Sequence, residues 1–265
     1  MRKVTLPDLL KKKGVEPIVM VTCYDAAFAR LAEMADIETL LVGDSLGMVI
    51  KGENSTLGVS LEEVAYHVRA VRRGAPSPFL IADMPFGSYQ SSIEKGIESA
   101  VTLMKAGAEA VKVEGGSETA PLVERLTAIG IPVVGHIGLT PQYVNLFGGY
   151  RQRGKSAAER ELIAEGARRL VRAGAVMVVL EAIPERLAAE ITSAVPVPTI
   201  GIGAGPDTDG QVLVLYDLLG MNSSFTPSFL KKYLDLERLV TTALARYRRE
   251  VCERKFPLRR NKQEQ

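Results

Sequence analysis

Four acidic residues stand where an apolar run of the chain ends: Asp44 in LLVGDS, Asp83 in FLIADMP, Glu114 in VKVEGG and Glu181 in MVVLEAI. One acid behind a strand could be an ordinary helix cap, but four in the same position indicate a shared role. Acids that meet at one edge repel each other unless a cation or a proton compensates. Asp44, Asp83 and Glu114 offer only oxygen ligands, so we predict a site for a hard divalent ion such as Mg²⁺.

Lys112 lies two residues before Glu114 in AVKVEGG (110–116), and strand alternation puts both side chains on one face. A charge on a buried face needs partners. Two interpretations stay open: Lys112 holds a negative oxygen of an anionic substrate, or it forms a salt bridge that merely neutralises the acids. His136, in VGHIGLTPQ, is also near a strand end, whereas His67, in EEVAYHVRAV, is predicted to be a structural helix residue.

The segments KAGAEAVKVE (105–114) and RAGAVMVVLE (172–181) share a pattern of basic residue, Ala-Gly-Ala, apolar run and glutamate. Reuse of glycine in helix-to-strand turns could explain the Ala-Gly-Ala part but not the terminal acid. Glu181 is therefore the counterpart of Glu114, and Val179 stands where the other segment has Lys112. We expect Glu181 to lie in an apolar setting.

Strand-like runs alternate with helical patterns along the whole chain. Strands are predicted at 17–25, 39–45, 79–85, 110–116, 132–138, 176–183, 198–205 and 211–220, and helices include LEEVAYHVRAVRRG and AAERELIAEGARRLVRAG. Eight such units in 265 residues predict a single α/β domain over 1–265, a (β/α)8 TIM-type barrel followed by a basic C-terminal helix and tail. The alternative is a doubly wound open sheet, but the chain lacks the G-x-G-x-x-G fingerprint typical of that fold.

Composition limits the partners. A net charge of +2 argues against nucleic acid, and no apolar run approaches the ~20 residues of a membrane span. The N-terminal stretch MRKVTLPDLLKKKG lacks a signal-peptide core, and two cysteines form no disulfide framework, so we expect a cytoplasmic protein. We expect Cys23 to be a small buried apolar residue.

Several long strings are typical of one family: VTCYDAAFARL, LLVGDSLGMVIKG, ADMPFGSY, AVKVEGG, GHIGLTPQYVNLFGGY and IGIGAGPDTDGQVLVLYDLLG. With them the chain resembles the ketopantoate hydroxymethyltransferase family from about residue 3 to about residue 250. The resemblance implies a barrel related to phosphoenolpyruvate mutase and isocitrate lyase, and a homo-oligomer, commonly a decamer. It also implies a small-molecule reaction, in which a one-carbon unit of 5,10-methylenetetrahydrofolate is added to 3-methyl-2-oxobutanoate to give 2-dehydropantoate.

The same resemblance assigns roles to residues. It implies that Asp44, Asp83 and Glu114 are the Mg²⁺ ligands and that Asp44, Ser45, Asp83 and Lys112 contact the 2-oxoacid. It implies that Glu181 is the catalytic proton acceptor and not a metal ligand.

Two alternatives remain beside this family. One is a Mg²⁺-dependent C–C lyase that acts on a 2-oxoacid without folate; it would usually carry a cysteine in a mouth loop, where this chain offers only Cys23, in the first strand. The other is an inactive barrel kept as a binding scaffold, which should have lost one of the four acids.

Overall fold

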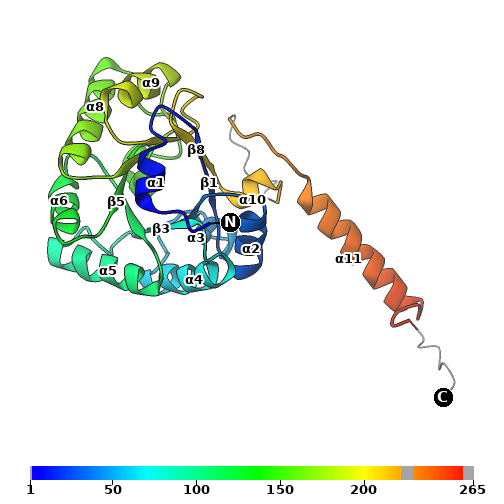
Figure 1. Ribbon diagram of the computed structural model, residues 1–265. Coiled ribbons are helices and arrows are strands. Elements are labelled where there is room, and N and C mark those ends of the chain that lie inside the picture. Colours follow the sequence, from blue (N-terminus) through cyan, green and yellow to red (C-terminus); the bar gives the residue numbers. More distant parts are fainter. Residues whose placement is uncertain (1, 222–228, 259–265) are drawn as a thin grey trace. The chain divides into compact units, whose positions relative to one another are not determined.

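Within residues 2–221 and 229–258, which our computed structural model describes, eight parallel strands close into a barrel in chain order, and β8 pairs with β1 (Figure 1). The strands are β1 (Ile18–Thr22), β2 (Thr39–Val42), β3 (Phe79–Asp83), β4 (Ala110–Glu114), β5 (Val133–Gly138), β6 (Met177–Glu181), β7 (Thr199–Ile202) and β8 (Gly210–Leu213). The predicted (β/α)8 barrel is confirmed.

Helical segments follow strands β1 to β6, and the longer ones lie on the outside of the barrel (Figure 1). They are α2 (Ala26–Met34), α3 (Leu46–Val49), α4 (Leu61–Gly74), α5 (Ile93–Ala106), α6 (Ala120–Ala128), the 3₁₀ turn η1 (Pro141–Tyr143), α7 (Val144–Phe147), α8 (Ala157–Arg172) and α9 (Glu185–Ala194). The sequence sets their ends: Ser60 and Glu63 form a capping box that starts α4, and Gly107 ends α5 in the left-handed conformation.

The barrel interior is apolar below its mouth. One cluster of buried residues combines the inward-facing side chains of the strands with Leu9 of α1 (Leu6–Leu10), and Val4 and Leu6 pack against it. Because Ala110, Ile81 and Val179 are members of this cluster, alternation turns Lys112, Asp83 and Glu181 inward as well.

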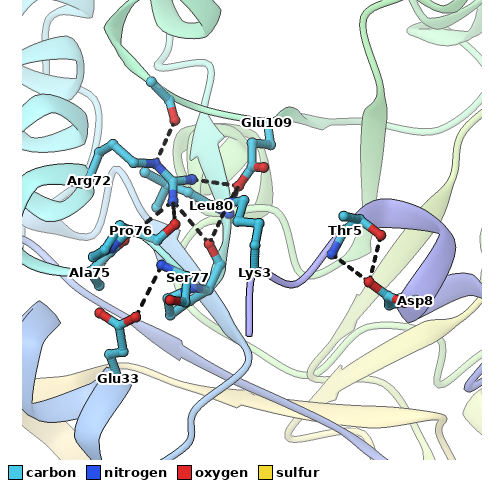
Figure 2. A network of polar contacts seen from close by, with 12 residues as sticks. Lys3, Thr5, Asp8, Glu33, Arg72, Ala75, Pro76, Ser77, Leu80 and Glu109 are labelled. Carbon is cyan, nitrogen blue, oxygen red and sulfur yellow. Dashed lines mark hydrogen bonds and ion pairs between the residues drawn. The ribbon is translucent and has the colours of Figure 1, made fainter. Parts of the chain in front are cut away.

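A polar network ties α4 to the ends where strands begin (Figure 2). The guanidinium of Arg72 pairs with Glu109 and donates to the carbonyl oxygens of Gly107 (3.1 Å) and Pro78 (3.1 Å). Lys3 approaches the same Glu109 carboxylate at 2.7 Å. This network lies before the first residues of β3 and β4, so it stabilises the barrel at the end opposite the predicted site.

The last predicted strand, 211–220, is wrong in its second half. The strand β8 ends at Leu213, and Leu215–Leu218 forms the short helix α10. Asp44 likewise lies in the turn after β2 and not in the strand.

The chain divides into two compact units, Met1–Val214 and Leu215–Gln265. The first contains the whole barrel, and the second contains α10 and α11 (Leu236–Cys252), whose last turn carries part of the predicted basic segment. One domain over 1–265 stays a prediction, and residues 259–265 of the predicted tail lie outside the described residues. Among the described helices, none combines the length and the apolar character that a membrane span requires.

Candidate active site

The strand register gathers the predicted residues at the carboxyl ends of neighbouring strands. Asp83 pairs with Lys112 across β3 and β4, and Glu114 pairs with His136 across β4 and β5. Glu181 ends β6, the next strand. We call Asp44, Asp83, Lys112, Glu114, His136 and Glu181 the mouth cluster. Glu181 keeps 19% of its side chain exposed, whereas Asp83, Lys112, Glu114 and His136 keep at most 5%.

Lys112 lies between the carboxylates. Its Nζ is 3.1 Å from Oδ1 of Asp83, 3.7 Å from Oε1 of Glu114 and 3.0 Å from Nδ1 of His136. Burial pushes the pKa of Lys112 down, but the charges of Asp83 and Glu114 outweigh burial, so the pKa lies above its ordinary value. In the absence of a substrate, Lys112 therefore acts as a counter-ion, which leaves both interpretations of its role open.

Asp44 reaches the cluster through a tight turn. Its backbone N–H donates to Oδ2 of Asp83 (2.9 Å), and a Cβ at the preceding Gly43 would come within 2.7 Å of Oγ of Ser45. Burial raises the pKa of Asp44 well above its ordinary value, and the charges of Asp83 and Glu114 add to that rise. Ser45 is half-buried beside Asp44, with Oγ 2.8 Å from the Tyr24 hydroxyl.

Two carboxylate oxygens of the cluster are buried without a hydrogen bond. They are Oδ1 of Asp83 and Oε1 of Glu114, which face their ion-pair partners, while the other oxygen of each accepts from a backbone N–H. Such oxygens suit a hard cation. In the described parts of the chain, however, no group of three or more His, Cys, Asp or Glu side chains is arranged so that it could hold one metal ion. The donor set fits Mg²⁺ because this ion commonly takes one or two carboxylates and fills its other positions with water and substrate.

His136 connects the two halves of the cluster. Its Nδ1 is 3.2 Å from Oε1 of Glu114, and its Nε2 is 3.1 Å from Oε2 of Glu181. Burial and Lys112 lower the pKa of His136, but Glu114 and Glu181 outweigh them and raise it to about 9. The prediction that Glu181 lies in an apolar setting is wrong on the side that faces β5, because β5 places the His136 imidazole there. Residue spacing along β6 alone could not reveal this neighbour.

Gln142 of η1 was not predicted, although it contacts two members of the cluster. Its Nε2 donates to Oδ2 of Asp44 (2.9 Å), and its backbone N–H donates to Oε2 of Glu114 (2.9 Å). A polar residue just after the strand end in GHIGLTPQ was the available signal.

The two remaining expectations concern residues outside the cluster. Cys23 is fully buried, and burial raises the pKa of its thiol to about 11, so it is the apolar residue that we expected and not an acid at the mouth. His67 lies within α4, where its Nδ1 contacts the carbonyl oxygen of Tyr24, in agreement with a structural role.

Comparison with known proteins identifies relatives over nearly the whole chain. The family model described as ketopantoate hydroxymethyltransferase matches residues 3–259. A 3-methyl-2-oxobutanoate hydroxymethyltransferase of Thermotoga sp. (strain RQ2) is 55% identical over 94% of this chain and 92% of its own length. A protein of the same name from Leptospira interrogans serovar copenhageni is 53% identical over 93% of this chain and 94% of its own.

Solved structures show the same fold at low identity. A phosphonopyruvate hydrolase in complex with oxalate and Mg²⁺ superposes with a TM-score of 0.64 at 15% identity, over 97% of this chain and 90% of that one. A 2,3-dimethylmalate lyase, described as a member of the PEP mutase/isocitrate lyase superfamily, gives a TM-score of 0.57 at 14% identity, over 98% and 90%. These likenesses confirm the predicted barrel fold.

Proposed function

Because the chain belongs to the ketopantoate hydroxymethyltransferase family, we propose that the mouth cluster is the site at which it performs this family's reaction. The protein is a transferase that adds a hydroxymethyl group to 3-methyl-2-oxobutanoate and yields 2-dehydropantoate, the first step of pantothenate biosynthesis. The observation that carries the assignment to the mouth cluster is the pair of buried carboxylate oxygens, Oδ1 of Asp83 and Oε1 of Glu114, that face the Lys112 ammonium at 3.1 and 3.7 Å.

We propose Mg²⁺ as the cofactor, held by Asp44, Asp83 and Glu114 directly or through water. When bound, the ion would supply a Lewis acid that stabilises negative charge on the substrate oxygens. Support comes from the oxygen-only donor set and from the excess of buried carboxylates over cationic groups at the mouth. The Mg²⁺ in the phosphonopyruvate hydrolase belongs to that protein, and our proposal depends on the carboxylates of this chain.

The substrate contacts follow from charge and access. Lys112 would donate hydrogen bonds to the negative oxygens of the 2-oxoacid, since an ammonium stabilises an oxygen on which charge develops. Asp83 lies 3.1 Å from Lys112, and Asp44, whose backbone bonds Asp83, and the adjacent Ser45 complete the proposed contact surface, with the Ser45 hydroxyl as a hydrogen-bonding group.

Glu181 is proposed as the group that accepts a proton. Loss of the proton on C3 of the 2-oxoacid leaves an enolate, whose C3 then forms the new bond to the one-carbon unit. The bonds from that carbon to the folate nitrogens break, and water supplies the hydroxyl oxygen. Glu181 suits this step because it is the more accessible carboxylate, 19% exposed, and because it contacts no lysine. His136, 3.1 Å away, holds its carboxylate in place.

The donor and the assembly complete the proposal. The family resemblance supports 5,10-methylenetetrahydrofolate as the one-carbon donor, a homo-oligomer, commonly a decamer, and a cytoplasmic location.

The reaction is tested with purified protein, Mg²⁺ and 3-methyl-2-oxobutanoate, with and without methylenetetrahydrofolate, followed by NMR. We expect 2-dehydropantoate only when the folate is present. Cleavage of a 2-oxoacid without folate would instead identify the lyase alternative.

Glu181→Gln tests the proton-transfer role in the same assay. We expect kcat to fall by about 10²–10⁴-fold, the usual scale of general acid–base catalysis, while the 2-oxoacid still binds. Lost exchange of the C3 proton with solvent would assign Glu181 to enolisation, and retained exchange would assign it to the later transfer. The control is Glu190→Gln on the outer helix α9, where the carboxylate is 58% exposed. Normal turnover in Glu181→Gln would exclude the role.

A further inference from the structure

Gln142 is a buried side chain that joins segments following three different strands. It is 5% exposed and lies in η1, after β5. Its Nε2 donates to Oδ2 of Asp44 and to the carbonyl oxygen of Met84 (3.0 Å). Its backbone N–H donates to Oε2 of Glu114. One residue therefore fixes one oxygen on each of two carboxylates, one in the turn after β2 and one at the end of β4.

The orientation of the Gln142 amide is determined by groups that can play only one role. The Met84 carbonyl can only accept, so the amide nitrogen must face it and Asp44. On the other side, Oε1 of Gln142 lies 2.9 Å from the Tyr89 hydroxyl and 3.0 Å from Nε2 of Gln90. Gln90 is oriented in turn, because its own Oε1 accepts from the backbone N–H of Gly87 (2.8 Å).

The hydrogen bonds of Gln142 and Asp44 engage one particular oxygen of each carboxylate. Glu114 is bonded at Oε2, so its Oε1 is left facing Lys112 and His136. Asp44 is bonded at Oδ2, and its backbone N–H in turn bonds Oδ2 of Asp83, so Oδ1 of Asp83 is left facing the Lys112 ammonium. Each bond restricts the rotation of its carboxylate. The carboxylates are thus held with one oxygen engaged, as outer-shell partners hold ligands at metal sites.

We propose that Gln142 is a positioning residue that presents Asp44 and Glu114 to a divalent cation at the barrel mouth. The inference rests on the proposed function, in which these two carboxylates and Asp83 serve the ion. Gln142 itself touches neither the ion nor the substrate in this account, and it acts through the two carboxylates.

The test measures binding of Mn²⁺ alone to the full-length protein, by the EPR signal of free Mn²⁺. Gln142→Met keeps the volume of the side chain and removes the donor to Asp44 without adding charge, while the backbone N–H that bonds Glu114 remains. We expect Mn²⁺ affinity to fall about 10–100-fold, the usual effect of losing an outer-shell partner. The matched control is Gln211→Met on β8, where an exposed glutamine donates to the Gly205 carbonyl, and its affinity should match that of the wild type.

A folded Gln142→Met protein that binds Mn²⁺ as the wild type does would overturn the proposal, even if its melting temperature had fallen. If Gln142→Met does not fold, Gln142→Asn decides, because it keeps an amide but is one methylene too short to reach Asp44. Weakened binding by that variant supports the role, and unchanged binding overturns it. A wild type that binds no Mn²⁺, or an Asp83→Asn variant that binds it normally, would instead refute the metal site on which the inference rests.

Discussion

Replacement of Lys112 by methionine removes a buried ammonium that lies 3.1 Å from Asp83 and 3.7 Å from Glu114. Removing one partner of a buried ion pair costs about 3–5 kcal/mol, because the remaining charge stays desolvated. For a domain of this size, 1 kcal/mol corresponds to about 2–4 °C. We therefore expect calorimetry in EDTA at neutral pH to show a melting temperature about 6–20 °C below that of the wild type.

The deficit of Lys112→Met should depend on pH and on metal. Lys112 lowers the pKa of Asp44 and of Glu114, so without the ammonium both pKa values rise, acid protonates these carboxylates in the folded state, and the deficit shrinks as the pH falls. Saturating Mg²⁺ should restore part of the stability, because a ligand that binds the folded state stabilises it. Lys95→Met is the control, since Lys95 on α5 is 49% exposed and its pair with Glu98 contributes little.

Enzyme kinetics separate the two roles that the sequence left open for Lys112. If it also holds the substrate, kcat/KM of Lys112→Met with Mg²⁺ present should fall by about 10–100-fold or more, which corresponds to about 1.5–3 kcal/mol. A melting temperature within 2 °C of the wild type in EDTA would refute the counter-ion reasoning, because a 2 °C difference corresponds to about 1 kcal/mol or less. A lowered stability with unchanged kcat/KM would refute the substrate contact.

Four further outcomes follow from other parts of the molecule. Arg72→Ala should lower the free energy of unfolding by about 1.5–3 kcal/mol and leave kcat/KM unchanged, because its bonds lie at the far end of the barrel; impaired kinetics in the folded variant would contradict this. Gly138→Ala should reduce both stability and turnover, because a Cβ there would lie 2.3 Å from the carbonyl oxygen of Glu181 at the end of β6. Gly148→Ala is the control: it is also at positive φ but has open space around it, so turnover should stay intact. Equal effects of the two substitutions on turnover would contradict the steric account. A thiol reagent should modify exposed Cys252 rapidly and buried Cys23 only on unfolding, and rapid modification of both thiols would disprove the burial of Cys23. Burial raises the pKa of Cys23 from 9.0 to about 11, so the neutral thiol contributes its full share to the free energy of unfolding below pH 9. That share should be lost as the pH rises to about 11, by about 1.4 kcal/mol per pH unit, when urea titrations of the wild type are compared with those of Cys23→Ala.

The barrel could be predicted because its cause is local and repeated. Each unit carries an apolar run, most carry a helical pattern as well, and several helices start at their own capping residue, as α4 does at Ser60. Strand alternation also predicted that Lys112 and Glu114 share a face and that Glu181 faces inward with Val179. The short helix α10 was missed because its first residues, Leu215 and Tyr216, continue the apolar run of β8.

The partners inside the mouth could not be predicted from spacing along the chain. The contact between His136 and Glu181 depends on the register between β5 and β6, and the contact of Gln142 with Asp44 joins residues 98 positions apart. Register depends on packing around the whole barrel, so no single segment encodes these contacts.

The most direct measurement of the central claim is a crystal structure of the protein with Mg²⁺ and 3-methyl-2-oxobutanoate. Our account predicts an ion at the barrel mouth, about 2.0–2.1 Å from a carboxylate oxygen of Asp44, Asp83 or Glu114. The Lys112 ammonium should lie within hydrogen-bonding distance of the 2-oxoacid, and Glu181 should face C3 without touching the ion. An ion or a substrate bound away from these side chains would contradict the account.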